Sequence, residues 1–208
     1  MLLLLTALAL GASIAPAAAR KCDPQGSELS LDLDKSTVRW RGTKFWGLGK
    51  HEGTVRLKGG AFCIRQGRVL HGWFEADMRS LEVTDIPASE PVPRRRLTEH
   101  LLGENFFAVG AHPVSRFILR EVQHERGHLY RVSGDLTIRG RTRPLTFYAR
   151  GWSVTDQELR AQAGFKIDRH EFGVSYRGST LKDDLVDDDF ELELVIEARS
   201  PRGAITGR

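Results

Sequence analysis

The stretch of sequence that decides the fold is SGDLTIRGRTRPLTF, residues 133–147. It holds two short strand-like runs, Asp135–Ile138 and Pro144–Phe147, joined by Arg139–Arg143, in which Gly140 supplies the backbone geometry of a tight turn. Polar and apolar residues alternate in the first run, which indicates a strand with one buried face and one wet face. The stretch therefore predicts a hairpin of an antiparallel sheet that packs one face on an apolar interior.

The same period-two alternation covers most of the chain. It is clearest in the last strand, where apolar residues occupy every second position from Phe190 to Ile196. One interruption has helical spacing: Leu97 and Leu101 lie four residues apart, which predicts a short amphipathic helix over residues 93–103. Many short strands with one helix favour an all-β antiparallel barrel or sandwich, and periodicity alone does not distinguish the two.

The first nineteen residues have the pattern of a signal peptide. Residues 2–10 are almost wholly apolar, and Ala17–Ala19 supplies the small residues for cleavage after position 19. No Lys or Arg follows the first methionine, and residues 2–19 carry no charge, so a retained membrane anchor is the competing interpretation. We expect export, to the periplasm or out of the cell.

Composition bounds the rest of the chain. Subtracting 19 residues from 208 leaves 189, enough for one domain with a sizeable core. We expect that domain over residues 28–199 and a flexible tail over residues 200–208. The formal net charge of +4 is spread along the chain, and no basic patch with interleaved aromatic residues occurs. The sequence therefore argues against a nucleic acid as a partner.

The two cysteines, Cys22 and Cys63, suit an exported protein. An even count is compatible with a disulfide, here enclosing 40 residues. Loop closure would then stabilise the fold by about 3–4.5 kcal/mol. Lipidation of Cys22 lacks the small apolar run that precedes a lipoprotein cysteine, and two free thiols remain the other alternative. A disulfide is the prediction.

Several blocks of the chain, taken in order, resemble the YceI-like family of periplasmic β-barrels that carry polyisoprenoid lipids. Residues 133–147 resemble the G-x-L-T-I-x-G-x-T-x-P signature of that family. The likeness extends from Leu31 to Ala198, and the joint order and spacing of the blocks make it specific. The other blocks are Asp77–Leu81, Leu97–Leu101, Asn105–Phe107, His112–Phe117 and Phe165–Gly173.

The resemblance implies a closed, lipocalin-like barrel that binds a long-chain isoprenoid lipid, either a polyprenol or an isoprenoid quinone, and carries or stores it without catalysis. It implies no resident cofactor, transient contact with a membrane or a membrane redox protein, and an oligomeric state that is open to a dimer. Each expected ligand-binding residue also fits an ordinary packed core. These residues are Trp40, Phe74, Met78, Leu97, Leu101, Phe107, Phe117, Val132, Leu136, Phe147, Phe165 and Phe172.

The contacts of a lipid head group are less defined. Arg79, Arg94 or Arg169 could donate hydrogen bonds to a head group near the mouth. The loop from Lys44 to His51 is more aromatic than the first hairpin of the family, and Asp187–Asp189 is unusually acidic. We therefore assign no ligand contact to the aromatic residues of that loop.

The sequence offers little for catalysis or metal binding. It holds no G-x-S-x-G elbow, H-E-x-x-H helix or phosphate-cradling glycine loop. Asp168–Glu171 combines acid, base and cation, but adjacent strand residues point to opposite faces and cannot act together. His124 and His128 flank a turn, and Asp183–Asp189 lacks the glycine-bearing loop of a calcium hand. We predict no enzyme and no metal site.

Two other functions remain open at this stage. An enzyme acting on a lipid-linked substrate would place an essential polar residue inside the tunnel. An interaction module of the envelope stress response would have a barrel filled by its own side chains and would carry no lipid. Core and cavity use the same residue types, so the sequence does not separate these alternatives.

Overall fold

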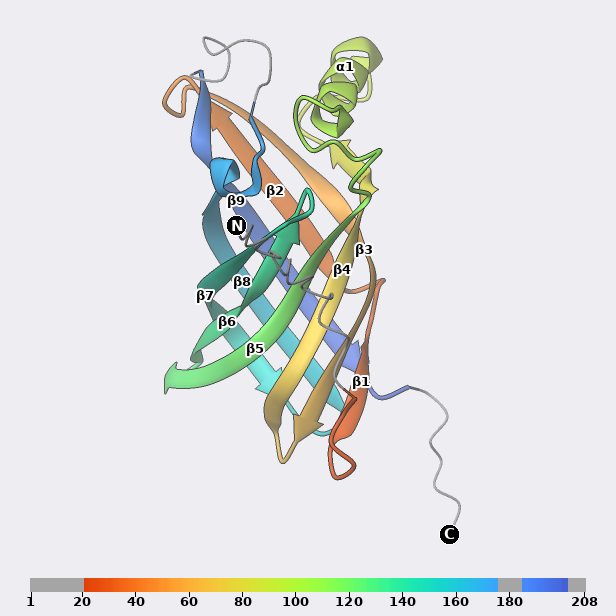
Figure 1. Cartoon of the computed structure of the whole chain (residues 1–208), viewed down its shortest axis with the longest axis vertical. Helices are drawn as coiled ribbons and strands as arrows, with labels where there is room; N and C mark the ends of the chain where they lie inside the picture. The colour runs from red at the N-terminus through yellow and green to blue at the C-terminus, as the bar shows by residue number, and fades with distance from the viewer. Residues whose placement is uncertain (1–20, 176–184, 202–208) are drawn as a thin grey trace, which may run out of the picture.

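A computed structural model describes residues 21–175 and 185–201 of the chain. These residues are mostly strand, which confirms the predicted all-β, lipocalin-like class (Figure 1). The predicted signal peptide, residues 1–19, and most of the predicted tail lie outside the described residues. The elements are β1 (Ser27–Leu31), β2 (Thr37–Lys44), β3 (Gly49–Arg65), β4 (Arg68–Val83), α1 (Pro91–Leu102), β5 (Val114–Arg126), β6 (Leu129–Ile138), β7 (Arg141–Val154), β8 (Glu158–Asp168), the 3-10 helix η1 (Arg169–Phe172) and β9 (Val186–Arg199).

The strands close into an eight-stranded up-and-down barrel. From β2 to β9 each strand pairs antiparallel with the next, and β9 pairs back with β2. The short β1 lies between β3 and β9 beyond the end of β2, and it pairs with both. Closure leaves the barrel ring without an unpaired edge, and it resolves the choice between barrel and sandwich.

The hairpin of residues 133–147 is present, with longer strands and a shorter turn than the sequence predicts. Only Arg139 and Gly140 form the turn, with φ values of 51° and 70°. Two residues with positive φ give the hairpin turn whose twist matches that of the strands. The prediction that residues 141–143 belong to the turn is wrong, because these residues pair with Leu136–Ile138 and extend β7 to the open end, where their exposed side chains keep their charges in water.

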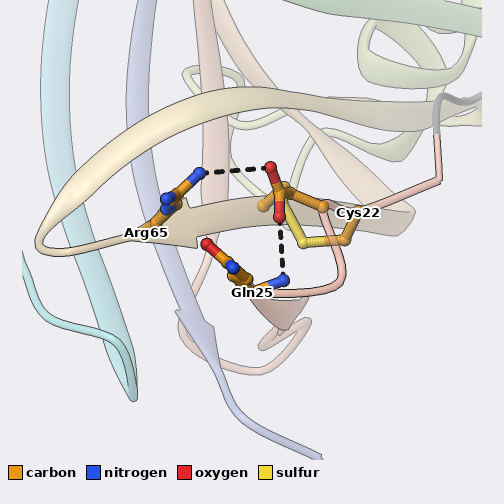
Figure 2. Close-up of a disulfide and its surroundings, with 5 residues drawn as sticks. Cys22, Gln25 and Arg65 are labelled. Atoms are coloured by element: carbon orange, nitrogen blue, oxygen red, sulfur yellow. Dashed lines mark hydrogen bonds and ion pairs between the residues drawn. A yellow bond between two sulfur atoms is a disulfide. The ribbon is translucent and has the colours of Figure 1, made fainter.

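One end of the barrel, which we call the closed end, carries the β3–β4 hairpin and β1 (Figure 1). Its inward side chains fill the interior: Leu29, Ile64 and Leu159 are almost completely buried. A disulfide joins Cys22 to Cys63 and so fixes the segment before β1 to β3, as predicted. The carboxylate of Asp23, the residue after Cys22, accepts hydrogen bonds from the backbone amide of Gln25 at 2.8 Å and from the Arg65 side chain at 3.4 Å. Figure 2 shows both contacts beside the disulfide.

The opposite end, which we call the open end, carries α1, the β2–β3 hairpin and η1 (Figure 1). Helix α1 spans Pro91–Leu102, which confirms the predicted helix over residues 93–103. Proline suits the first turn of a helix because it has no amide hydrogen to leave unpaired there. Arg94 Nε donates to the Val83 carbonyl oxygen at 2.8 Å, and Leu101 is buried, so the helix is fastened to the end of β4.

The segment after β8 is not a strand. The carboxylate of Asp168 accepts a hydrogen bond from the His170 amide at 2.7 Å, which caps the 3-10 helix η1. Gly173 ends this helix in a left-handed conformation, with φ of 68°. The interpretation of Asp168–Glu171 as strand residues is therefore wrong beyond Asp168, because a capped turn follows it.

Candidate functional site

The open half of the barrel encloses a cavity of about 330 Å³. This volume is in the range of small-molecule sites, roughly 300–1,000 Å³. The wall is largely apolar, and each of the eight barrel strands contributes to it. One wall residue from each strand, from β2 to β9 in order, is Val38, Val55, Met78, Ser115, Leu136, Leu145, Phe165 and Leu192.

Four phenylalanine rings form the base of the cavity, which we call the phenylalanine floor. Phe74 and Phe117 have ring centroids 5.4 Å apart, and Phe117 and Phe147 are 5.7 Å apart. Phe147 stacks on Phe165 at 4.4 Å. Phe74, Phe117 and Phe147 also line a void of only about 30 Å³ toward the closed end. The floor therefore separates the cavity from the filled half of the barrel.

A glycine on the neighbouring strand makes room for the central ring of the floor. A Cβ atom on Gly134 of β6 would lie 2.4 Å from Cζ of Phe117 and 2.4 Å from the Ile118 carbonyl oxygen. No side chain fits at that distance, so glycine lets the Phe117 ring lie across the barrel. Gly134, the first glycine of the hairpin stretch of residues 133–147, thus has a packing role as well as a place in the signature.

Helix α1 and the loop that follows it cover part of the open end. Leu97 and Leu101 line the cavity from the helix, and Phe106 and Phe107 line it from the loop. The rings of Phe106 and Phe107 meet edge to face at 5.0 Å, and Phe107 meets Phe190 of β9 at 6.4 Å. This aromatic contact links the cover to the barrel wall on the far side of the cavity.

The structure brings most of the predicted ligand-binding residues together around the cavity. Two of the twelve lie elsewhere. Val132 faces the small void below the floor, and Phe172 of η1 is fully buried in the core without lining the cavity. The ten that line the cavity are Trp40, Phe74, Met78, Leu97, Leu101, Phe107, Phe117, Leu136, Phe147 and Phe165.

Both exceptions have a physical reason. Val132 is on the inward face of β6, but it lies two positions beyond Gly134 toward the closed end, so the floor separates it from the cavity. Phe172 lies in η1 rather than in a strand, and its ring completes the core under that turn. Alternation identifies inward side chains but does not give their height along the barrel axis.

Of the three arginines considered for a head group, only Arg169 lines the cavity. Its side chain is buried, and it donates to the carbonyl oxygens of Val174, Val186 and Asp187 at 3.1–3.2 Å. Arg169 therefore holds η1 against the start of β9 and shapes the rim of the cavity.

The remaining polar groups of the mouth were not among the predicted ligand-binding residues. They come from the ends of β2, β3 and β9 and from α1, where strand alternation gives no functional signal. Asp189 is exposed and also lines the cavity, so the cavity reaches the surface there. The others that line it are Thr43, Lys44, His51, His100 and Asp187.

A hydrogen bond fastens the rim between β3 and the segment after β4. His51 Nδ1 lies 2.9 Å from Asp85 Oδ2, and the Glu52 amide donates to Asp85 Oδ1 at 3.0 Å. Burial of Asp85 acts to raise its pKa, but the hydrogen bonds from Glu52 and His51 outweigh burial and hold that pKa below its ordinary value. The carboxylate is therefore charged at neutral pH and fixes the ring of His51 at the mouth.

Two residues that line the cavity, Trp40 and Ser115, each carry a buried polar atom without a hydrogen-bond partner among the residues that the structure describes. These atoms are Nε1 of Trp40 and Oγ of Ser115, and Ser115 is buried as a whole residue.

Over the same ranges, 21–175 and 185–201, no three His, Cys, Asp or Glu residues gather as a metal site would require. None of the helices described there is long and apolar enough to cross a bilayer.

The comparisons with known proteins agree with this architecture. A family model described as the YceI-like domain matches residues 29–198. The solved structure of BcnA from Burkholderia cenocepacia is similar, with a TM-score of 0.62 and 18% identity over 80% of this chain and 98% of that one. A polyisoprenoid binding domain from Saccharophagus degradans, implicated in plant cell wall breakdown, has a TM-score of 0.59 and 14% identity over 83% of this chain and 98% of that one. No curated protein matches the chain significantly.

Proposed function

The chain belongs to the YceI-like family, and from this premise we propose that its barrel binds the apolar chain of an isoprenoid lipid, a polyprenol or an isoprenoid quinone. The observation that carries the proposal is the apolar cavity of about 330 Å³, with a floor of aromatic rings and an outlet at the open end. The similar fold of a polyisoprenoid binding domain supports it. We place the function in carriage or storage of the lipid, with no bond made or broken.

The wall suits a hydrocarbon chain because such a chain needs no polar partners. Each buried methylene contributes about 0.8 kcal/mol, so a few five-carbon units suffice for retention. The entropy lost on association and ordering keeps the affinity below that simple sum. In a cavity lined by Val38, Met78 and Leu136, the affinity for a ligand depends on its length and apolar surface more than on any single contact.

Oxygen atoms of the ligand have two places to bind. The rim offers His51, His100 and Lys44, which can donate hydrogen bonds to a head group at the mouth. Deeper in the wall, the Ser115 hydroxyl can donate to a ligand oxygen, which would relieve the cost of burying it without a partner. A neutral head group with carbonyl or hydroxyl oxygens fits these donors, and isoprenoid quinones and polyprenols both carry one.

The disulfide and the amino-terminal segment support a compartment outside the cytoplasm. A Cys22–Cys63 disulfide persists in an oxidising compartment such as the periplasm or the extracellular space. Residues 1–19 have the composition of an export signal. We therefore propose that the protein acts outside the cytoplasm, where a lipid carrier would shield its ligand from water.

The cavity also bears on the two alternative functions, an interaction module and an enzyme, and it favours neither. The interaction module requires a filled barrel, and the open half is hollow. An enzyme requires acid, base or nucleophile groups that converge inside the tunnel, whereas the polar groups that line it lie mainly at the mouth. Both observations favour a binding protein.

Two tryptophan substitutions on neighbouring residues test the proposal. Leu145 lines the cavity, whereas Thr146, the next residue on β7, is exposed on the outer face. We expect Leu145→Trp to fill part of the cavity and to lower the affinity for an isoprenoid quinone by about tenfold or more, because lost apolar contact of ~1.4 kcal/mol already gives that factor. Fluorescence titration of the purified protein with the quinone measures it.

The matched variant Thr146→Trp should bind the quinone like the wild type. Equal affinity of the wild type and both variants would contradict the cavity as the binding site. Thermal unfolding of all three proteins separates a filled cavity from a misfolded barrel.

A further inference from the structure

The tip of the β2–β3 hairpin exposes large apolar side chains. Trp46 is 86% exposed and Leu48 is 89% exposed, and Phe45 beside them is also exposed. An exposed tryptophan and leucine at one convex tip differ from the rest of the barrel surface, where exposed apolar residues are scattered singly. The tip is therefore a candidate for contact with another apolar phase.

The tip has a defined conformation. The backbone of Phe45, Trp46 and Gly47 has positive φ values of 54°, 56° and 85°. A left-handed conformation is unfavourable for aromatic residues, so it persists only where other contacts hold it. The side chain of Asp187 supplies them, because it accepts hydrogen bonds from the Trp46 and Gly47 amides at 3.1 Å each.

Two further contacts tie the tip to the barrel. The Thr43 hydroxyl group donates a hydrogen bond to the same Asp187 carboxylate. The Phe45 amide donates to the Leu185 carbonyl oxygen at 2.9 Å. The fold thus orders this backbone through β9 while the side chains of Trp46 and Leu48 remain in water.

The tip lies at the mouth of the cavity. Thr43, Lys44 and His51 of the same hairpin line the cavity. Figure 1 shows this hairpin and α1 at the same end of the barrel. At the start of α1, Val92 is a further exposed apolar side chain.

The charged side chains within the hairpin loop are basic, and the acidic side chain that contacts the tip, Asp187, is engaged in hydrogen bonds to Thr43, Trp46 and Gly47. From Thr43 to His51 the loop carries Lys44 and Lys50 and no acidic residue. Lys44 Nζ lies 5.7 Å from the centroid of the Phe45 ring, and Lys50 pairs with Glu52 at 2.9 Å below the tip. Tryptophan is enriched at membrane–water interfaces, and flanking lysines extend their charged ends toward the head groups.

We propose that this hairpin tip inserts Trp46 and Leu48 into the interfacial region of a phospholipid bilayer and so docks the cavity mouth on the membrane. The insertion is shallow and reversible, because two or three side chains bury little area compared with an amphipathic helix. The proposal deepens the proposed function, since a lipid ligand enters from a bilayer, but the surface itself is tested without any isoprenoid.

The test uses protein purified from the exported fraction of an expression host and vesicles of phosphatidylethanolamine and phosphatidylglycerol without isoprenoid lipid. We expect the wild type to sediment with the vesicles and Trp46→Ser/Leu48→Ser to lose about tenfold or more of that partitioning. Leu33→Ser/Tyr148→Ser is the matched control, because it removes one exposed leucine and one exposed aromatic ring away from the mouth. It should partition like the wild type.

Quenching by bromine-labelled acyl chains gives a second readout that is specific to the tip. We expect quenching of tryptophan fluorescence in the wild type and its loss in Trp46→Ser, whose side chain is too exposed to contribute to folding. A wild type that does not bind vesicles, or a tip variant that binds and is quenched like the wild type, would overturn the proposal. Vesicle binding by a protein that takes up no isoprenoid would uphold the docking surface and refute the proposed cargo instead.

Discussion

The two halves of the barrel use the same strands and the same alternation but differ in what fills them. At the closed end, inward residues such as Leu29 and Leu159 are buried in one apolar core, and β1 and the disulfide reinforce the wall. At the open end, the inward residues leave about 330 Å³ empty under α1. The closed half therefore stabilises the fold and the open half holds the cavity, and the phenylalanine floor is the boundary between them.

The largest expected effect comes from breaking that boundary. Phe117→Ala removes the central ring of the floor, and we expect the free energy of unfolding to fall by about 3–5 kcal/mol. The loss also joins the cavity to the void below, so the preference should shift toward isoprenoid quinones with longer tails. Denaturant unfolding and titration with quinones of graded tail length measure the two effects.

The control for the floor is Phe62→Ala in the filled half. Phe62 is buried and lines the void below the floor but not the cavity. It should cost stability comparable to that lost in Phe117→Ala while the tail-length preference stays that of the wild type. A shift of preference in both variants, or in neither, would mean that the floor does not set the depth of the site.

The next effect in size concerns the closed end alone. Replacing Cys22 and Cys63 by serine opens a covalent loop of 40 residues, and we expect the free energy of unfolding to fall by about 3–4.5 kcal/mol. Because the disulfide lies far from the cavity, quinone affinity of the folded protein should change by less than about twofold. Denaturant unfolding and the quinone titration check the two halves of this prediction. A large loss of affinity in the folded variant would contradict the division between the two ends.

The smallest effect sharpens the description of the open end. The pKa of Asp85 is lowered in the folded protein, so its contribution to stability is present above its ordinary pKa of about 3.9 and is lost as the pH falls through its folded value. Asp85→Asn should therefore lower stability by about 0.2–1 kcal/mol at pH 7 and by less near pH 3. Unfolding curves of both proteins between these pH values measure the difference, and a difference that grows toward low pH would refute this assignment.

The sequence predicted the features that repeat along the chain. Alternation located the strands, the spacing of Leu97 and Leu101 located α1, and the even cysteine count gave the disulfide. Barrel closure came from the resemblance, since the pairing of β9 with β2 joins residues too distant in sequence for any local pattern to show.

Height along the barrel axis is what the sequence did not reveal. Val132 and Leu136 have the same inward pattern, yet only Leu136 lines the cavity. The height of each residue depends on register and on how far a neighbouring ring reaches, as Gly134 permits for Phe117. The contacts within the rim were not predicted for a related reason, because Asp187 acts through contacts with a hairpin about 140 positions away.

The most direct test of a hollow, lipid-binding open half is native mass spectrometry of the wild type and Leu145→Trp, both purified without detergent, followed by organic extraction. The account predicts a stoichiometric polyprenyl species on the wild type and a reduced or absent one on the variant. A wild type that carries no lipid and takes up no added isoprenoid quinone would contradict the account and would favour an interaction module.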